Sequence, residues 1–335
     1  MESNNEKEYY SCNYLQSGLN FHTLNISSCN SWSKGLVFYK LNEPNVALKI
    51  DFEEIDKIRK NVLASKIIPE NCKECYNLEK KEWANNNNKI KYIDIDHWRN
   101  CNCGCIYCSN RNHDFTEFLT NKVTKSPFYD VMPILEKIKE KNRLDKDLHV
   151  QLIGGEAYSL EEYEDIIKFF LNHEDEMKGT CSISMLTSAI KYVPIIGKAL
   201  ERPQKFLTTS LDCGSRELYK KIKQIDAFDD CVANLKKYIE HAYVKAQVIL
   251  KYIFLPNIND NKAEIDKFFE TVQKIGCVYV NFSLEFCQSL THKQGSKIPE
   301  NLYELFDYAE SKAKEIGCTY EVWPFVKDLL KKGHY

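Results

Sequence analysis

The sequence predicts an α/β protein in which a parallel sheet is covered by helices. Apolar strand-like segments alternate with amphipathic helical segments from about residue 90 onward, and they form six successive βα units without a long hairpin signal. An asparagine run at 85–88 cannot pack, and it separates these units from a more irregular front segment. Six βα units suit either a doubly wound open sheet or a partial barrel. Both folds place the active site at the carboxyl ends of the strands.

Each expected element follows from the spacing of apolar residues. In the front segment we expect one amphipathic helix, at 52–63. Strands are expected at short apolar runs, namely 90–95, 148–153, 181–186, 206–211, 246–254, 278–286 and 318–322. Helices are expected at 128–141, 189–201, 215–241 (in two pieces), 262–274 and 300–316. A further helix should begin at a capping box of Ser159 and Glu162 and run to about His173.

The composition is that of an ordinary soluble globular protein, and its cysteines are expected to be reduced thiols. Of the 335 residues 43% are hydrophobic and 28% charged, and the net charge of −2 gives no reason to expect nucleic-acid binding. The polar start lacks a secretory signal, and no run approaches the ~20 apolar residues that span a bilayer. We therefore expect a cytoplasmic protein without a membrane partner. Its fourteen cysteines are then not expected to form disulfides.

Four of these cysteines lie within eight residues, at 101–108. Read as Cys101-x3-Cys105-x2-Cys108, three thiolates can point from one tight loop onto a single iron–sulfur cluster. A [4Fe–4S] cluster would then have one iron without a cysteine, open to a small molecule. Cys103 either replaces one of these ligands or packs beneath the loop as a small apolar residue. The competing reading is a zinc ribbon, made of the Cys72/Cys75 and Cys105/Cys108 pairs, which leaves Cys101 without a role.

The loop resembles the CxxxCxxC motif of the radical S-adenosylmethionine (radical SAM) superfamily, with Tyr107 at its usual aromatic position. Gly154, Gly155 and Glu156 resemble the GGE motif of that family, which meets the methionine amino group of SAM. The resemblance implies a partial (β/α)6 TIM-like barrel with a [4Fe–4S] cluster whose fourth iron is chelated by SAM. Reductive cleavage of SAM would yield a 5′-deoxyadenosyl radical that abstracts hydrogen from the substrate.

Weaker matches continue along the chain to about residue 326. Thr187 and Ser188 stand where the family often has a Thr-Asn-Gly turn, and Ser210 and Asp212 where it has a Ser-x-Asp near the SAM ribose. Lys251 and Asn257 fall in the segment of strand five that neighbours SAM in related proteins. Cys213 and Cys287 lie near predicted strand ends. By analogy with some family members, either thiol could return a hydrogen atom to a substrate radical.

The front segment holds four more cysteines: Cys12, Cys29, Cys72 and Cys75. Four thiolates are the number that a fully ligated cluster needs. The segment resembles the auxiliary-cluster region of SPASM or twitch proteins, here placed ahead of the barrel. The usual Gly-x4-Cys spacing is missing before Cys29, which makes the Cys72/Cys75 pair the firmer half of the set. A zinc site that only staples a small domain is the alternative.

These observations predict a small N-terminal iron–sulfur auxiliary domain at 1–86, a core barrel at 87–326 and a tail at 327–335. The expected enzyme would draw electrons from a flavodoxin- or ferredoxin-like donor. An auxiliary cluster beside a radical site is commonest in family members that modify peptides or carbohydrates. We expect a peptide substrate first and a sugar or nucleotide-sugar second. A non-catalytic zinc or iron–sulfur protein for electron transfer is the alternative from another class.

Overall fold

The computed structural model of the chain describes residues 9–23, 25–30, 35–41, 49–65, 67–73, 75, 77–81, 88–108, 129–285, 299–323, 326–327 and 330. These residues belong to two compact units. The first unit takes its residues from 1–100, 125–155 and 159–184, and the second from 101–124, 156–158 and 185–335. The predicted division at residues 86 and 326 separates an auxiliary cluster-binding segment, a core barrel and a tail. This division stays a prediction.

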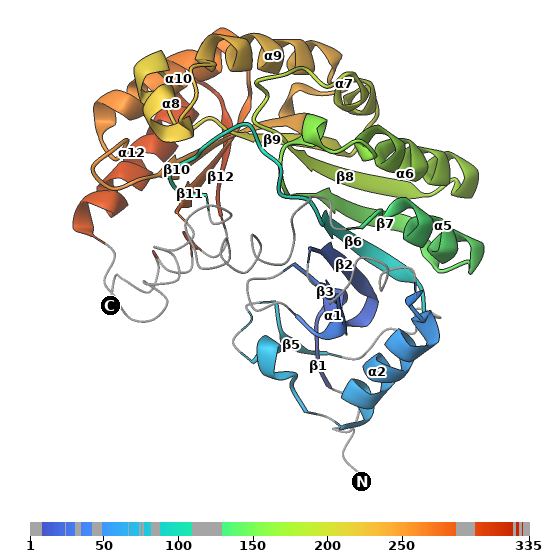
Figure 1. Cartoon of the computed structure of the whole chain (residues 1–335). Coiled ribbons are helices and arrows are strands. Elements are labelled where there is room, and N and C mark those ends of the chain that lie inside the picture. Colours follow the sequence, from blue (N-terminus) through green and yellow to red (C-terminus); the bar gives the residue numbers. More distant parts are fainter. Residues whose placement is uncertain are drawn as a thin grey trace. The chain divides into compact units, whose positions relative to one another are not determined.

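The first unit is built on strands β6 (Ile90–Asp96), β7 (Leu144–Leu152) and β8 (Thr180–Leu186), which lie side by side in chain order. β6 and β7 run parallel, with Asp94 opposite Gln151. Helices α5 (Met132–Glu140) and α6 (Tyr163–Met177) connect these strands, and each buries one apolar stripe (Figure 1). The connections are therefore the βα crossovers that the apolar periodicity predicts.

The front segment is more regular than the sequence indicates, because it adds three strands to the same sheet. β2 (Gly18–His22) pairs in parallel with β6, and β3 (Asn25–Ser27) and β4 (Val37–Lys40) follow in antiparallel. Helix α2 (Phe52–Ser65) confirms the predicted amphipathic helix, and its buried Arg59 donates to the carbonyl of Gly18. The segment also holds a short helix and a two-stranded ribbon, namely α1 (Asn13–Ser17), β1 (Tyr9–Ser11) and β5 (Glu79–Lys81).

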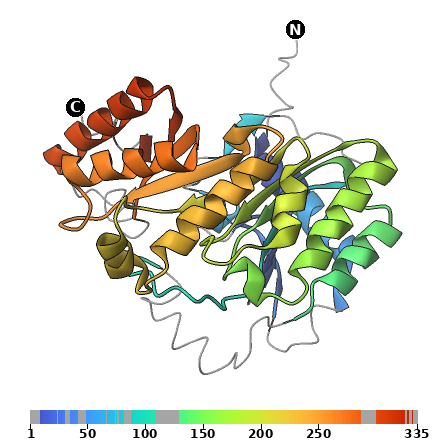
Figure 2. The same cartoon turned by 90° about the horizontal axis from the view of Figure 1, so that it is seen from above.

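The second unit contains four parallel strands in chain order: β9 (Lys205–Ser210), β10 (Val248–Phe254), β11 (Tyr279–Leu284) and β12 (Thr319–Val322). Its helices are α7 (Pro194–Leu200), α8 (Arg216–Lys223), α9 (Phe228–His241), α10 (Lys262–Ile275) and α12 (Glu300–Glu315). Both views show α9 and α10 side by side (Figures 1 and 2). Aromatic rings from β10, β11, α10 and α12 form the core between the helices and one face of the strands, among them Phe254, Phe268, Phe282 and Phe306.

The predicted fold class is confirmed, since parallel strands alternate with helices in both units. Within each unit, the strands of the βα units lie side by side in the same order as in the chain. A doubly wound sheet would instead reverse its strand order at one point. The observed order is that of a barrel wall. The predicted helix at 215–241 is indeed in two pieces, because Gln224 adopts a left-handed backbone (φ 57°) and ends α8. No helix among the described residues is long and apolar enough to cross a membrane.

The predicted capping box at Ser159 and Glu162 is wrong. Ser159 closes a short 3-10 turn (Ala157–Ser159), and its hydroxyl donates to the carbonyl of Asn100 at 2.7 Å. Helix α6 begins four residues later, with Glu162 as its N-cap residue. The Glu162 carboxylate instead binds Nε2 of buried His97 at 2.5 Å. Both side chains thus form hydrogen bonds with residues that precede the cysteine loop. The start of helix α6 therefore has no side-chain cap.

Candidate functional site

The cysteine loop at 101–108 is anchored by the end of helix α8. The backbone N–H of Gly104 donates to the carbonyl of Lys223 at 2.8 Å, and the N–H of Ile106 donates to the carbonyl of Ile222 at 3.0 Å. A turn within the loop adds a bond from the N–H of Cys108 to the carbonyl of Cys105 at 3.0 Å. Carbonyls at a helix C-terminus have no partners inside the helix, so this loop satisfies groups that would otherwise need water. The loop conformation is therefore set by α8 as well as by its own sequence.

The four thiols of the loop differ in exposure. Cys101 is exposed and Cys105 and Cys108 are half-buried, whereas Cys103 is only 5% exposed. Hydrogen bonding from the Cys103 thiol lowers the pKa of Cys101, and it lowers that of Cys105 to about 6 with help from the nearby Lys223 charge. The same two contacts, with burial, raise the pKa of Cys103. Since thiolates are the metal ligands, the loop favours ligation by Cys101 and Cys105 over Cys103.

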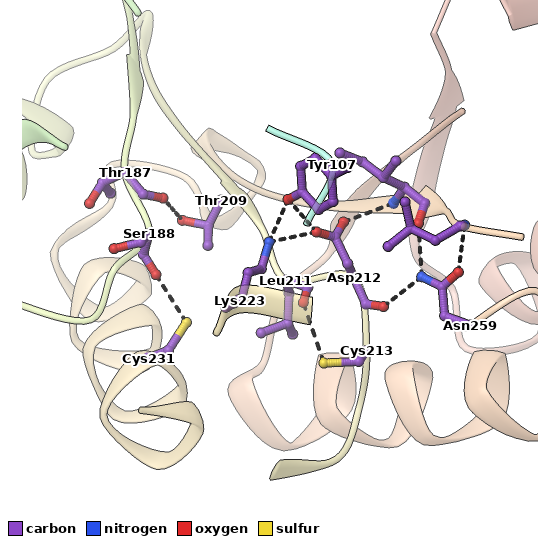
Figure 3. Close-up of polar contacts among 12 residues, drawn as sticks. Tyr107, Thr187, Ser188, Thr209, Leu211, Asp212, Cys213, Lys223, Cys231 and Asn259 are labelled. Atoms are coloured by element: carbon purple, nitrogen blue, oxygen red, sulfur yellow. Dashed lines mark hydrogen bonds and ion pairs between the residues drawn. The ribbon is translucent and has the colours of Figure 1, made fainter. Parts of the chain in front are cut away.

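Three side chains, two of them buried and the third half-buried, fasten the loop to the end of β9 (Figure 3). The Tyr107 hydroxyl donates to Oδ2 of Asp212 at 2.6 Å, and the Lys223 ammonium donates to the same oxygen at 2.6 Å and to the Tyr107 hydroxyl at 2.5 Å. We call Tyr107, Asp212 and Lys223 the loop clamp. Burial alone would lower the pKa of Lys223, but the Asp212 carboxylate, Tyr107 and Cys105 together raise it well above its usual value. Lys223 is therefore a fixed cation beside the loop.

The other carboxylate oxygen of Asp212 is also engaged. Oδ1 accepts the N–H of Ile253 at 2.8 Å, and the Asp212 backbone carbonyl accepts the Asn259 side chain at 2.9 Å (Figure 3). Asp212 is fully buried with a left-handed backbone (φ 62°). Its carboxylate thus binds groups of the chain itself, which positions the loop, and its predicted place near the SAM ribose stays a prediction. Sequence reasoning selected Asn257, which is exposed, and missed Asn259, which is buried.

Gly154 and Gly155 allow the end of β7 to lie directly against the residues that precede the loop. A Cβ on Gly155 would lie 2.1 Å from the Asn100 carbonyl oxygen, and one on Gly154 would lie 2.9 Å from the Trp98 ring. The N–H of Gly155 donates to the Trp98 carbonyl at 3.0 Å. The pair is therefore required for close backbone approach, and the partner within the described structure is the chain's own 98–100 segment.

Glu156 fixes the turn that follows β8. Its buried carboxylate accepts the Thr187 hydroxyl and the Ser188 N–H, the latter at 2.7 Å. Two further bonds hold this turn. The Thr187 carbonyl accepts the Thr209 hydroxyl at 2.9 Å, and the Ser188 carbonyl accepts the Cys231 thiol at 3.3 Å (Figure 3). Ala189 completes the turn with a left-handed backbone (φ 57°). The predicted residues Glu156, Thr187 and Ser188 are thus brought together, and Glu156 also acts electrostatically on Cys101.

The front cysteines form a second group, in the first unit. The Cys12 thiol caps helix α1 by accepting the N–H of Leu15 at 3.2 Å, and Cys72 and Cys75 share a turn in which the Cys75 N–H donates to the Cys72 carbonyl at 3.0 Å. Burial raises the pKa of Cys72 to about 12, with further contributions from Cys29, Cys12 and Cys75. The four sulfurs are therefore close enough to interact. Their mutual repulsion as thiolates would be relieved by a bound cation.

A single metal ion does not fit either group as it stands. Within the described ranges, no three Cys, His, Asp or Glu side chains lie close enough together to hold one ion. A [4Fe–4S] cluster binds its thiolates through different irons, so its ligands stand farther apart than those of one zinc ion. The loop thiols form no disulfide, so they are free to act as ligands of this kind.

Comparison with known proteins decides the family. The family model described as the Radical SAM superfamily matches residues 95–272, more than half of the chain. The chain belongs to the radical SAM superfamily. Members of this superfamily are enzymes that use a [4Fe–4S] cluster together with SAM. The match includes the cysteine loop, the glycine pair, Glu156 and the loop clamp.

Individual relatives of this radical SAM chain are distant. A protein of Saccharolobus solfataricus named "Probable GTP 3',8-cyclase" is 24% identical over 70% of this chain and 66% of its own length, so the match spans just under two thirds of that relative. The solved radical SAM methyltransferase from Sphaerobacter thermophilus covers 69% of this chain and 65% of its own, with 16% identity and a TM-score of 0.46. Streptococcus suis SuiB bound to precursor peptide SuiA covers 81% and 54%, with 12% identity and a TM-score of 0.48.

The remaining residues predicted for the radical SAM site are placed as follows. Ser210 ends β9 and Lys251 is its register partner in the middle of β10. Cys213 is fully buried, and its thiol donates to the carbonyl of Leu211 at 3.4 Å (Figure 3). A thiol without exposed surface is poorly placed to give a hydrogen atom to a substrate. Cys287 lies outside the described residues.

Proposed function

We propose that this protein is a SAM-cleaving enzyme whose [4Fe–4S] cluster is held by Cys101, Cys105 and Cys108. Bound there, the cluster and SAM would supply a 5′-deoxyadenosyl radical that removes a hydrogen atom from the substrate. The observation that carries the proposal is the clamped loop, which presents three accessible thiols on an anchored backbone inside the matched domain. Cys103 is assigned the spare role, because its thiol is buried and donates to its neighbours.

The chain's own residues would prepare this site in two ways. The loop clamp fixes the loop before any cofactor binds, so the thiolates need little reorganisation. Gly154 and Gly155 fix the end of β7 against residues 98–100, and Glu156 fixes the turn after β8; the methionine part of SAM is expected at this motif. The residues that we propose to line the cofactor also include Thr187, Ser188, Ser210 and Lys251. Tyr107 and Asp212 belong to the same set, and both hold the cysteine loop.

We further propose that Cys12, Cys29, Cys72 and Cys75 hold an auxiliary iron–sulfur cluster. Support comes from the mutual electrostatic effect of these thiols and from the absence of disulfides among the described cysteines. Replacing Cys72 and Cys75 together with Ala should remove about four irons per chain from the reconstituted protein. Unchanged iron content would contradict the assignment, and zinc in place of the lost iron would favour the structural alternative.

For the substrate we propose a peptide, with a sugar or nucleotide-sugar as the second candidate. Both suit an enzyme that carries an auxiliary cluster in addition to its SAM cluster. The relative named as a probable GTP 3',8-cyclase adds nucleoside triphosphates to the compounds to be tested. A flavodoxin- or ferredoxin-like donor in a cytoplasmic setting completes the proposal. The alternative from another class is a zinc or iron–sulfur protein that only transfers electrons.

The deciding experiment is anaerobic incubation of the reconstituted full chain with SAM and dithionite. We expect release of 5′-deoxyadenosine and methionine, quantified by chromatography against a sample without reductant. Protein that retains a full cluster but releases no 5′-deoxyadenosine would leave only the electron-transfer alternative. Protein purified without oxygen that holds zinc and no iron would contradict the whole proposal.

A further inference from the structure

The turn that carries Cys29 is shaped by contacts from the sheet rather than by a sequence motif. It follows strand β3, and the Gly-x4-Cys spacing that is usual before such a cysteine is missing. Burial raises the pKa of Cys12 and of Cys72, and the nearby Cys29 thiol raises both further. The Cys29 sulfur therefore lies near these two sulfurs, although its own sequence surroundings carry no signal for this.

One peptide group, between Cys29 and Asn30, is held at both of its polar ends. Its carbonyl accepts the Ser27 hydroxyl at 3.1 Å, and its N–H donates to Oδ2 of Asp94 at 3.1 Å. Ser27 and Asp94 are 0% and 4% exposed, so water has little access to these two partners. Because a peptide group is planar, holding both ends fixes its orientation next to the Cα atom of Cys29.

Strand pairing places these two partners. Strands β6, β2 and β3 lie side by side in this order, and Asn20 of β2 is the register partner of both Asp94 and Ser27 (Figure 1). The Asn20 amide donates to the Ser27 hydroxyl at 3.1 Å, which leaves the hydroxyl hydrogen for the Cys29 carbonyl. Asp94 reaches the turn from a strand that lies 64 positions from Asn30 in the sequence. The turn is thus fixed by the sheet.

Gly35 leaves room for the Cys29 sulfur on the returning chain. Its backbone is left-handed (φ 51°), and a Cβ there would lie 2.7 Å from Sγ of Cys29. Two hydrogen bonds close this return: the Ser28 N–H donates to the Leu36 carbonyl at 2.9 Å, and the Leu36 N–H donates to the Ser28 hydroxyl at 3.0 Å. The sulfur is therefore packed against backbone, while the adjacent peptide group is held by Ser27 and Asp94.

We propose that Asp94 is a positioning residue for the auxiliary cluster. By holding the peptide group after Cys29, its carboxyl would direct the Cys29 thiolate toward the cluster that the other front cysteines share. The inference rests on the proposed auxiliary cluster and adds to it a residue of strand β6. Groups that orient a metal ligand typically change metal affinity 10- to 100-fold when they are removed.

The test follows iron loss from the full chain, reconstituted without oxygen and then mixed with an excess of an iron chelator. Wild type should start with about eight irons, four in each cluster. Electron paramagnetic resonance of the reduced protein, with and without SAM, tells the clusters apart, because only the cluster with an open iron should respond to SAM. Asp94→Ala should lose the SAM-insensitive cluster about 10- to 100-fold faster than wild type. Asp94→Asn should lose it at a rate near that of wild type, since its amide oxygen still accepts the Asn30 N–H.

A second variant and a control complete the comparison. Ser27→Ala removes the hydrogen bond at the carbonyl end of the same peptide group, so it should also speed the loss of this cluster. Gln151→Ala, at the register partner of Asp94 on β7, should behave as wild type. A retained SAM-responsive signal shows that each variant is folded. If Asp94→Ala lacks this signal, the result with Ser27→Ala decides.

Two results would overturn the proposal alone. One is iron loss at the wild-type rate in both Asp94→Ala and Ser27→Ala. The other is equally fast loss in Asp94→Ala and Asp94→Asn, which would assign the effect to the charge of the carboxylate. Wild-type protein that holds only the SAM-responsive cluster would instead show that the proposed auxiliary cluster is absent, and it would overturn the role of Asp94 with it.

Discussion

At the scale of single residues, backbone strain marks the turn that Glu156 holds. Ala189 has a φ of 57°, in the left-handed region that favours glycine, although it carries a Cβ. Its N–H donates to the Thr187 hydroxyl at 3.0 Å, and the Thr187 hydroxyl in turn binds Glu156. This network keeps the alanine in a conformation that it would otherwise leave. Strain of this kind persists where surrounding contacts over-determine the backbone.

Replacing Ala189 with Gly should therefore cost much less stability than the same change at an unstrained site. Relief of the left-handed strain, about 1–2 kcal/mol, should offset the added freedom of the unfolded chain and the loss of one buried methyl group, so the free energy of unfolding should stay within about 0.5 kcal/mol of wild type. Chemical denaturation measures the difference. Ala199→Gly, in helix α7, is the control and should lower stability, because its backbone is helical and its side chain is buried. Equal losses in both variants would show that Ala189 is unstrained.

At the scale of elements, the loop clamp joins three parts that are distant in the sequence. Tyr107 comes from the cysteine loop, Asp212 follows β9 and Lys223 ends α8. The Lys223 and Asp212 side chains are 4% and 0% exposed, so the ion pair is buried. Removing one partner from a buried pair costs more than the pair contributes, because the remaining charge is left without compensation.

Lys223→Met should lower the free energy of unfolding by about 3–5 kcal/mol, because it leaves the Asp212 carboxylate buried and unpaired. The variant should also retain less iron after reconstitution, since the loop loses its anchor. Lys221→Met changes an exposed lysine on the same helix and should stay within about 0.5 kcal/mol of wild type. Adding Asp212→Asn to Lys223→Met should recover part of the loss. Full stability and full iron content in Lys223→Met would refute the clamp.

These elements also show what the sequence can and cannot predict. The alternating strands and helices were predictable because their apolar residues repeat with clear periods, and the loop was predictable from three cysteines in a short space. The clamp was not, since Lys223 lies 116 positions from Tyr107 and looks like any basic residue at a helix end. β2, β3 and β4 escaped prediction because they are short and are stabilised by pairing within the sheet rather than by local pattern.

At the scale of the whole molecule, buried acids make stability depend on pH. Burial raises the pKa of Asp94, on β6, to about 7. The native state then keeps this proton up to about pH 7, whereas the unfolded chain loses it near pH 4. Between these values the native state binds more protons, so this residue makes the protein less stable as the pH rises. Asp96 acts in the same direction, because burial raises its pKa to about 6, and His97 in the opposite one, because burial lowers its pKa to about 3.

Asp94→Asn should remove the contribution of this one group while keeping an acceptor for the N–H of Asn30. The stability of the variant relative to wild type should increase from pH 5 to pH 7.5, at up to about 1.4 kcal/mol per pH unit. Denaturant midpoints of both proteins at several pH values measure the difference, in which the contributions of Asp96 and His97 cancel. A difference that is constant over this range would show that Asp94 has an ordinary pKa.

The molecule as a whole combines a strand-and-helix scaffold with a short loop that carries the proposed chemistry. The family match accounts for the scaffold and the cofactors, and the geometry adds which side chains hold the loop. The assignment of ligands within the loop rests on the difference between three accessible thiols and the buried thiol of Cys103.

The most direct test compares four alanine variants, at Cys101, Cys103, Cys105 and Cys108, by the 5′-deoxyadenosine each releases from SAM and dithionite under anaerobic conditions. The account predicts that the Cys101, Cys105 and Cys108 variants release none, while Cys103→Ala keeps activity near that of wild type. Loss of activity in Cys103→Ala, or normal activity in any of the other three, would contradict the proposed site.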